Sequence, residues 1–523
     1  NTRTEETKIG HNFSINSNFY LLFTPPGLVS SNILAVYPCP SISHQIVFRP
    51  LTLELLKRGH RMTVVTPDPM YPKGGGHENL TEIDVHDRSY AVLKKYFVSY
   101  VTGNNWDLLN QVKGILDLVS VSFEELMETK EVQHLINNKK EKYDLILLES
   151  MYPQALAISH TFRAPTVLIS SFGPYVDSYK IMGIPTNPIL YHHMFRQRLY
   201  NLTLFEKLNE LYNQLVIHYE LNRREEKENE LLKKFFGPDI PPLNILKNYV
   251  DMLFINIHPI WEGNTPVPPN VIHMGGLHMK EPKNLPQDLQ QYLDASDNGV
   301  IYFSFGTNVQ LSMLPQNKIE MFENVLSQLP YNVIWKRDTD EVVMKSKNVK
   351  VYKWLPQADL LRHPNIKLFI TQGGLQSTDE AITAGVPLLG IPMLGDQWYN
   401  VEKYVYHEIG QRLYFEELTE EKLKNAILEV DNIIRLRSLM VDQPQTPLER
   451  TMWWVDYVLR HGGAKHLRAP AASISWTEYL ELDLLLFITC TLFILFGSIF
   501  LVMRVLVRII ASKIKHDKKL KNE

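Results

Sequence analysis

Short apolar runs rich in β-branched residues alternate along the chain with longer segments that are polar on one face. In the first half these runs cover residues 33–39, 61–67, 143–150 and 164–171, and in the second half 299–307, 331–336, 348–356, 366–372 and 385–393. Such alternation is typical of parallel strands wrapped by helices. It predicts an α/β protein.

A stretch rich in Pro and Asn divides the two groups of predicted strands. It reads "GPDIPPLNILKN" and, further on, "NTPVPPNVIHMGG". Clusters of this kind mark turns and linkers. We therefore expect two doubly wound, Rossmann-like domains facing a cleft, the first over residues 31–245 and the second over 276–446, joined by a linker region over 246–275.

Residues 484–503 form an uncharged apolar run of 20 residues. As a helix this run spans about 30 Å, the thickness of a bilayer core. The alternative is a buried helix of a soluble domain, but such helices seldom lack charge over this length. The run is therefore predicted to be a single transmembrane helix. Acidic residues precede it and basic ones follow it, so the positive-inside rule places the basic tail at 504–523 in the cytosol. The rest of the chain is then luminal or extracellular. Residues 447–483 are then a returning helix and a juxtamembrane segment.

Two further features suit the secretory pathway. Lys519 and Lys521 resemble a dilysine retrieval signal of the endoplasmic reticulum, although a merely basic tail is the alternative. Asn12, Asn79 and Asn201 each head an Asn-x-Ser/Thr sequon, which is used only in that pathway. We expect a glycoprotein of the endoplasmic reticulum membrane with its main part in the lumen.

Charge and cysteine content limit the classes of protein to which the chain can belong. The formal net charge is −3 in 523 residues, so no global field favours nucleic acid, and any anion must be bound locally. The only cysteines are Cys39 and Cys490, and the second falls in the apolar run, so we expect no disulfide within a domain. Residues 1–30 are predicted to be an N-terminal segment that holds the remnant of a cleaved signal peptide.

A candidate anion site lies in "TQGGLQSTDEAITAG", which follows the predicted strand ending near residue 372. Doubly wound sheets bind ligands where their strands end and loops enter helices. Gly373 and Gly374 allow the backbone to approach a ligand, and Ser377, Thr378 and the free N–H groups of a helix start can donate to a phosphate. The alternative is a Gly-containing turn with a Ser/Thr helix cap.

The residues around this turn suggest a nucleotide sugar. The indole of Trp354 can stack on a base, and Glu380 can accept hydrogen bonds from a ribose diol. Asp396 and Gln397 suit hexose hydroxyls. Taken singly, Trp354 is more often a core residue, and Asp396 more often a turn residue.

The pattern "W-L-P-Q…T-Q-G-G…E…P…D-Q" over residues 354–397 resembles the signature of the UDP-glycosyltransferase superfamily. The chain is similar to its membrane-anchored animal members, especially insect ones, and "PLERTMWWVDYVLRHGGAKHLR" is a further family-like block. The resemblance implies a GT-B fold, a UDP-sugar held by the second domain, an acceptor held by the first, and inversion at the anomeric carbon without a metal or other cofactor.

The resemblance also implies roles for individual residues of the second domain. Trp354 would stack on uracil beside Gln357, Glu380 would bind the ribose, and Asp396 and Gln397 the sugar, while the diphosphate would be held by Thr307, Gly374, Gln376 and Ser377. Gln372 stands where many members have a His that binds the diphosphate. Its neutral amide can donate a hydrogen bond but cannot become cationic as charge develops on the leaving group.

A general base is needed because a hydroxyl is a poor nucleophile. His44 follows the first predicted strand in "PCPSISHQ" and matches the family's catalytic His, although a capping or surface role is the alternative. Glu149 ends the strand "YDLILLES" where the family has an Asp that orients this His. Glu is one methylene longer, and an inert carboxylate at a strand end is its alternative role. Asp144 begins the same strand and is expected to be structural.

Together these features predict an inverting UDP-glycosyltransferase that moves a hexose, chosen here as glucose, to a hydroxyl of a small lipophilic acceptor, as in detoxification. A nicotinamide-dependent oxidoreductase is disfavoured because the first strand is not followed by G-x-G-x-x-G. A membrane-tethered protein that binds a nucleotide sugar without catalysis stays as the alternative. Expected partners are the donor, the acceptor and the bilayer but no nucleic acid, and assembly into a homo-oligomer is left open.

Overall fold

The computed structural model describes residues 30–71, 76–102, 108–138, 140–307, 309, 314–338, 346–428, 434–472 and 474–520. The predicted N-terminal segment up to residue 29, with the sequon at Asn12, lies outside these residues. So does Lys521 of the predicted dilysine signal.

The first domain is built on a parallel sheet of seven strands in the order β3-β2-β1-β4-β5-β6-β7. Largely apolar runs form its central strands, whose residues are nearly all buried. The strands are β1 (Asn32–Val36), β2 (Arg61–Thr66), β3 (Leu80–Asp84), β4 (Leu145–Glu149), β5 (Thr166–Ser170), β6 (Val250–Ile255) and β7 (Val271–His273). The helices are α1 (Ile42–Lys57), α2 (His86–Thr102), α3 (Leu108–Met127), α4 (Lys130–Asn137), α5 (Leu156–Phe162), α6 (Val176–Met182), α7 (Leu204–Phe236), α8 (Leu243–Leu246) and α9 (Pro259–Glu262).

The second domain repeats this architecture with six parallel strands in the order β10-β9-β8-β11-β12-β13. Its strands are β8 (Val300–Ser304), β9 (Asn332–Lys336), β10 (Val349–Tyr352), β11 (Ile366–Thr371), β12 (Leu388–Gly390) and β13 (Gly410–Arg412). Its helices are α10 (Gln287–Asp294), α11 (Gln316–Ser327), α12 (Gln357–Leu361), α13 (Leu375–Ala384), α14 (Gln397–Tyr406), α15 (Glu420–Leu428) and α16 (Ile434–Val441). The prediction of two doubly wound α/β domains is confirmed.

The prediction that residues 246–275 form a linker region is wrong, because this range contains two strands of the first sheet, β6 and β7. In β6 all six residues of "VDMLFI" are buried, and this strand pairs with β5 on one side and β7 on the other. The first Pro- and Asn-rich segment precedes β6, and the second follows β6 and contains β7, so neither separates the domains. The chain crosses to the second domain only after β7.

Helix α17 (Pro447–His461) brings the chain back to the first domain. A capping box at Thr446 and Glu449 fixes its start. Its buried face packs with α1 and strands of the first sheet, and Arg58, the residue that caps the end of α1, pairs with Asp456 at 2.8 Å. This return agrees with the helix expected after residue 446.

The two domains contact each other where α9 meets α14. The hydroxyl of Tyr399 donates to the carbonyl of Glu262 at 2.9 Å, and Nε1 of Trp261 donates to Oδ1 of Asn400 at 2.9 Å. The buried Nζ of Lys403 donates to the carbonyl of Trp261. Burial lowers the pKa of Lys403 to about 7, against the opposing effect of Glu262.

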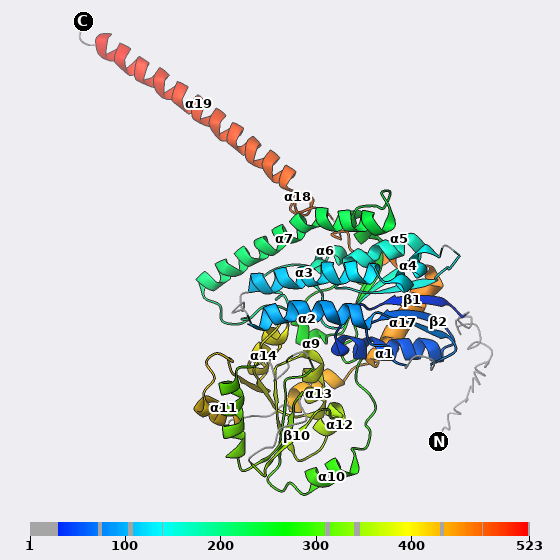
Figure 1. The fold of residues 1–523 in the computed structure, drawn as a ribbon. Helices are drawn as coiled ribbons and strands as arrows, with labels where there is room; N and C mark the ends of the chain where they lie inside the picture. The colour runs from blue at the N-terminus through cyan, green and yellow to red at the C-terminus, as the bar shows by residue number, and fades with distance from the viewer. Residues whose placement is uncertain are drawn as a thin grey trace, which may run out of the picture.

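After the short α18 (Trp476–Tyr479), the long helix α19 (Leu482–Leu520) leaves the body of the protein, as Figure 1 shows. Among the described residues it is the one helix long and apolar enough to cross a membrane, over Leu482–Lys515, and none of this span is buried against the protein. The predicted apolar run 484–503 lies within it. The helix continues through the basic residues that follow.

Candidate active site

Both sheets have a switch point at their centre, and the candidate residues gather there. In the first sheet β1 and β4 are neighbours, while the strands that follow them run toward opposite edges. In the second sheet β8 and β11 are related in the same way. Loops after such strands diverge and leave a crevice in which doubly wound sheets bind ligands. His44 follows β1 and Glu149 ends β4, whereas Thr307 follows β8 and Gln372 follows β11.

His44 and Glu149 form a hydrogen-bonded pair at the switch point of the first sheet. His44 lies in the first turn of α1, whose cap residue is Ser41. Its Nδ1 lies 2.6 Å from Oε1 of Glu149, and Oε2 of the same carboxylate accepts the backbone N–H of Cys39 at 3.0 Å. The Glu149 side chain is 1% exposed and that of His44 is 12% exposed. Because Nδ1–H is held by the carboxylate, Nε2 is the ring nitrogen left to take a proton.

The Glu149 carboxylate affects the pKa of the His44 imidazole as well as its orientation. Burial lowers the pKa of His44, but the neighbouring Cys39 and Glu149 outweigh this effect and hold it well above its usual value. Burial also raises the pKa of the Cys39 thiol, which is therefore neutral near pH 7. A neutral thiol cannot stabilise an imidazolium by charge, so we assign the raised pKa of His44 to the buried carboxylate.

Cys39, His44 and Glu149 each offer one metal-ligating atom, and these atoms lie within 4.8 Å of one another. A divalent metal of zinc type accepts such ligands. Here the imidazole and the carboxylate are already bonded to each other, which accounts for their closeness without a metal.

Two glycines let the loops of the second domain approach closely. Gly373 has φ +90°, and a Cβ at this position would overlap the side chain of Val401. Gly306 has φ +71°, and a Cβ there would overlap the amide of Gln372. The loop after β8, which carries the exposed Thr307, therefore lies against the turn after β11. Gly374 caps α13, so the free N–H groups of this helix start belong to the same turn.

Gln357 gathers two of the other predicted ligands. Its Nε2 donates to Oγ of Ser377 at 2.9 Å and to Oε2 of Glu380 at 2.8 Å. Its Oε1 accepts the hydroxyl of Tyr302 at 3.0 Å. Burial raises the pKa of Glu380 to about 6, although the hydrogen bond from Gln357 opposes the shift. Tyr302 was not predicted as a site residue, because a tyrosine within an apolar strand gives no sequence signal of a polar contact.

The predicted stacking residue Trp354 is open to solvent. It follows β10 by two residues and is 67% exposed. Nζ of Lys336 lies 5.4 Å from the centre of its ring and donates to the carbonyl of Gly306 at 2.6 Å. An exposed indole beside the glycine-lined loops offers a flat surface on which a base can stack.

Asp396 lies at the start of α14 and faces the first domain. Burial raises its pKa to about 6, and the hydrogen bond from Asn400 and the charge of His44 act in the opposite direction. The N–H of Gly395, next to Asp396, donates to Oε1 of Gln111 in the first domain at 3.3 Å, so this loop lies against the first domain. Asn400 ties this region together, because its Nδ2 donates both to Oδ2 of Asp396 and to the carbonyl of Gly373, each at 2.9 Å. Its spacing of four residues from Asp396 is the sequence signal that could have identified it.

Two predicted ligands have part of their hydrogen-bonding capacity engaged elsewhere. Gln397 is 6% exposed, and its Oε1 accepts the N–H groups of Met393 and Leu394 at 2.9 and 2.8 Å. Nε2 of Gln376 donates to the carbonyl of Ser171 in the first domain at 2.9 Å. In this structure Gln397 therefore shapes the loop before α14, and Gln376 links the two domains.

Comparison with known proteins identifies the family. Residues 33–520 match the family described as UDP-glucoronosyl and UDP-glucosyl transferase. An ecdysteroid UDP-glucosyltransferase of Spodoptera littoralis nuclear polyhedrosis virus is 32% identical, over 88% of this chain and 94% of the relative. UDP-glucosyltransferase 2 of Dactylopius coccus is 31% identical, over 88% and 90%. UDP-glucuronosyltransferase 2B19 of Macaca fascicularis is 28% identical, over 91% and 92%.

Solved structures show the same fold at low identity. The glycotransferase of kitacinnamycin aligns with a TM-score of 0.51 and 18% identity, over 84% of this chain and 97% of that one. The spinosyn forosaminyltransferase SpnP aligns with a TM-score of 0.52 and 17% identity, over 83% and 100%. The expected GT-B fold is thereby confirmed.

Proposed function

The chain belongs to the UDP-glucuronosyl and UDP-glucosyl transferase family, and from this premise we propose that it is an inverting transferase that moves glucose from UDP-glucose to a hydroxyl of a small lipophilic acceptor. The observation that carries the proposal is the position of His44, which is bonded to Glu149 at the switch point of the first sheet, together with the loop before Asp396, whose Gly395 N–H donates to Oε1 of Gln111 in the first domain at 3.3 Å.

The proposed reaction is one in-line displacement that uses no metal ion. Nε2 of His44 accepts the proton of the acceptor hydroxyl as its oxygen attacks the anomeric carbon. The new C–O bond forms while the bond from that carbon to the β-phosphate oxygen breaks, and UDP leaves with the electron pair. Glu149 stabilises the imidazolium that results. An α-linked donor then gives a β-glycoside.

The turn after β11 is the proposed site of the leaving diphosphate. Helix-start N–H groups of α13, the hydroxyls of Thr307 and Ser377 and the amides of Gln372 and Gln376 are donors that can stabilise its charge. Glu380 would take the ribose hydroxyls. Trp354 would carry the uracil, with Gln357 beside it.

Glucose is preferred to glucuronate because of the charge at the proposed sugar site. The pKa of Asp396 is raised to about 6 by burial, so its carboxylate is mainly ionised near pH 7. A second carboxylate on the sugar would be repelled there, whereas hydroxyls can donate to it. Relatives from both insects and insect viruses are named as glucosyltransferases, which supports the same choice.

The acceptor is proposed to be lipophilic because one aromatic side chain packs against the base and another lies beside the loop that leads to Asp396. The ring of Phe172 meets that of His44 edge-on at 5.3 Å between centres. Phe195 lies under the loop before Asp396, against Gly395. Steroid-like alcohols are one such class, as the names of the viral relatives indicate for those proteins.

We also propose that α19 anchors the protein in the endoplasmic reticulum membrane, with both domains in the lumen. The uncharged run within α19 and the basic residues after it support this topology. A tethered protein that binds nucleotide sugar without catalysis is the competing hypothesis.

The decisive experiment measures UDP release by the full-length protein from UDP-glucose, UDP-galactose and UDP-glucuronate, each with a panel of phenols and steroid alcohols. We expect turnover with UDP-glucose and its loss, by about 10²- to 10⁴-fold, in His44→Ala, with donor binding retained. Turnover restricted to UDP-glucuronate would contradict the choice of sugar. Donor binding with no turnover on any acceptor would favour the competing hypothesis.

A further inference from the structure

The exposed face of α7 changes character halfway along the helix. In its first half the exposed positions carry seven large apolar side chains that are 44 to 80% exposed: Leu204, Phe205, Leu208, Leu211, Tyr212, Leu215 and Tyr219. In its second half the exposed positions carry only polar or charged side chains: Asn222, Arg223, Glu226, Lys227, Glu230, Lys233 and Lys234. We call the first set the α7 apolar face.

The spacing of the α7 apolar face places its members along one side of the helix. They recur at intervals of three, four and seven residues, which is the period of a helical stripe about 22 Å long. The opposite side, with Asn213 and Ile217, is buried against the first domain. Contiguous apolar patches of this size are uncommon on soluble monomers and mark surfaces that meet a partner or a membrane.

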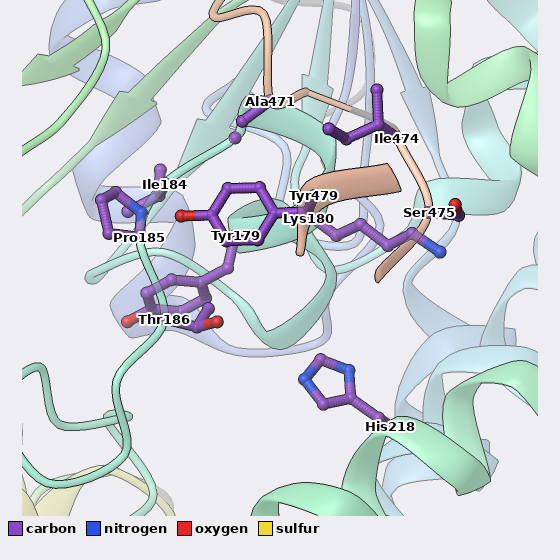
Figure 2. A pocket seen from close by; sticks show the side chains of 11 residues that line it. Tyr179, Lys180, Ile184, Pro185, Thr186, His218, Ala471, Ile474, Ser475 and Tyr479 are labelled. Carbon is purple, nitrogen blue, oxygen red and sulfur yellow. The ribbon is translucent and has the colours of Figure 1, made fainter. Parts of the chain in front are cut away.

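The α7 apolar face ends beside the point where α19 leaves the domain. His218 of α7 and Tyr479 of α18 line one pocket, together with Tyr179 and Lys180 of α6, and Figure 2 shows these side chains around it. Tyr219 follows His218 directly, and α19 begins three residues after Tyr479. Figure 1 shows α7 crossing the end of the molecule from which α19 projects.

We propose that the α7 apolar face lies in the interfacial layer of the bilayer that α19 crosses, as a second and monotopic membrane contact. The proposal rests on the anchoring by α19 proposed above. A helix with an apolar face of this kind sits about 5–10 Å into the boundary between headgroups and acyl chains. Tyr212 and Tyr219 suit that depth because their rings are apolar and their hydroxyls reach water.

A lipid surface fits this face better than a second copy of the chain does. Anchoring by α19 fixes the level of Tyr479 near the membrane surface, and the pocket shared with His218 puts the end of the apolar face at the same level. The proposed membrane contact ends where the exposed side chains of α7 become polar or charged, in the second half of the helix. This half also supplies a matched control on the same helix.

The test uses the full-length protein in phosphatidylcholine vesicles, with both native cysteines replaced by Ser. A single cysteine is introduced as Leu208→Cys, Leu215→Cys or Glu226→Cys and carries a small fluorophore, and nitroxide-labelled lipids serve as quenchers. In a fourth protein only Cys490 is kept, which lies within α19 and reports on the anchor. The readout does not require catalytic activity.

We expect labels at positions 208 and 215 to lose most of their fluorescence with a nitroxide near the headgroup, and the label at 226 to keep it. The label on Cys490 should be quenched best by a nitroxide deep in the acyl chain. Quenching at Cys490 without quenching at 208 and 215 overturns the second contact but leaves the anchor intact. A label on Cys490 that is not quenched overturns both. Disulfide cross-linking of Leu208→Cys between two copies, without quenching, would show that a second copy covers this face.

Discussion

Nδ1 of His44 and Oε1 of Glu149 are 2.6 Å apart, and the carboxylate of this pair is buried. A buried carboxylate that accepts a hydrogen bond from an imidazole N–H stabilises the charged ring. It therefore sets both the direction in which the ring points and the pH at which the ring can accept a proton.

The first prediction concerns the pH dependence of the transferase. The pKa of His44 is held well above its usual value by Cys39 and Glu149, which act against burial, and a base works only when it is neutral. We therefore expect kcat/KM to rise with pH through a pKa above that of an ordinary histidine. Glu149→Gln should lower this apparent pKa as well as the rate, because the stabilising charge is gone. A profile that is unchanged in Glu149→Gln would contradict the assigned pair.

Shortening the carboxylate tests its geometry. Glu149 binds both His44 and the N–H of Cys39, and an Asp at this position cannot span both contacts from the same backbone. We expect Glu149→Asp to lower kcat by about 10- to 100-fold while the KM for UDP-glucose changes little. Asp144→Asn is the control, because Asp144 lies at the other end of the strand and accepts the N–H of Asn32 at 2.8 Å. Equal losses in the two variants would mean that the effect is one of folding.

The exposed indole of Trp354 should contribute to donor binding. Stacking of a base on an aromatic ring contributes about 1–3 kcal/mol, so Trp354→Ala should raise the KM for UDP-glucose by about 5- to 150-fold and leave the acceptor KM nearly unchanged. Trp453→Ala is a matched control, since Trp453 is 47% exposed on α17, away from the proposed site. A similar rise in both variants would remove Trp354 from the donor site.

Lys403 makes stability depend on pH at the contact between the domains. Its pKa is lowered by burial to about 7, so between about pH 7 and 10 the unfolded chain binds more protons than the folded one. The free energy of unfolding should therefore rise with pH in this window, by at most about 1.4 kcal/mol per pH unit from this residue. Lys403→Met should flatten the rise in melting temperature measured in detergent. If the two proteins differ by a constant amount at every pH, this residue does not titrate in the window.

The fold was largely predictable because its central strands are apolar and buried and alternate with longer helical segments. Exceptions were elements that give weak patterns. Strands β7 and β13 have only three residues each, which is too short for a periodic pattern to show. Strand β6 was not predicted because the Pro and Asn residues around it are typical of a linker. Their place is fixed by pairing with neighbouring strands, which local sequence does not encode.

The candidate site was predictable in position but not in side-chain direction. The family resemblance assigned Gln357, Ser377 and Glu380 to one donor site, and in the structure Gln357 is joined to the other two by hydrogen bonds. The same kind of reasoning could not foresee that Oε1 of Gln397 would be taken by two backbone N–H groups, or that Gln376 would reach across to Ser171. Those bonds depend on loops that are distant in sequence.

The reactive pair is held by strands, whereas a side chain beside it comes from a loop, and this difference affects how the substrates of such a transferase can change. His44 and Glu149 are fixed by the adjacent strands β1 and β4, which a buried sheet holds in register. Phe172, which faces the imidazole, instead comes from the loop after β5. Drift in such loops can retune which molecules are accepted while the reactive pair stays in place, so a duplicated gene can acquire a new substrate without first losing its chemistry.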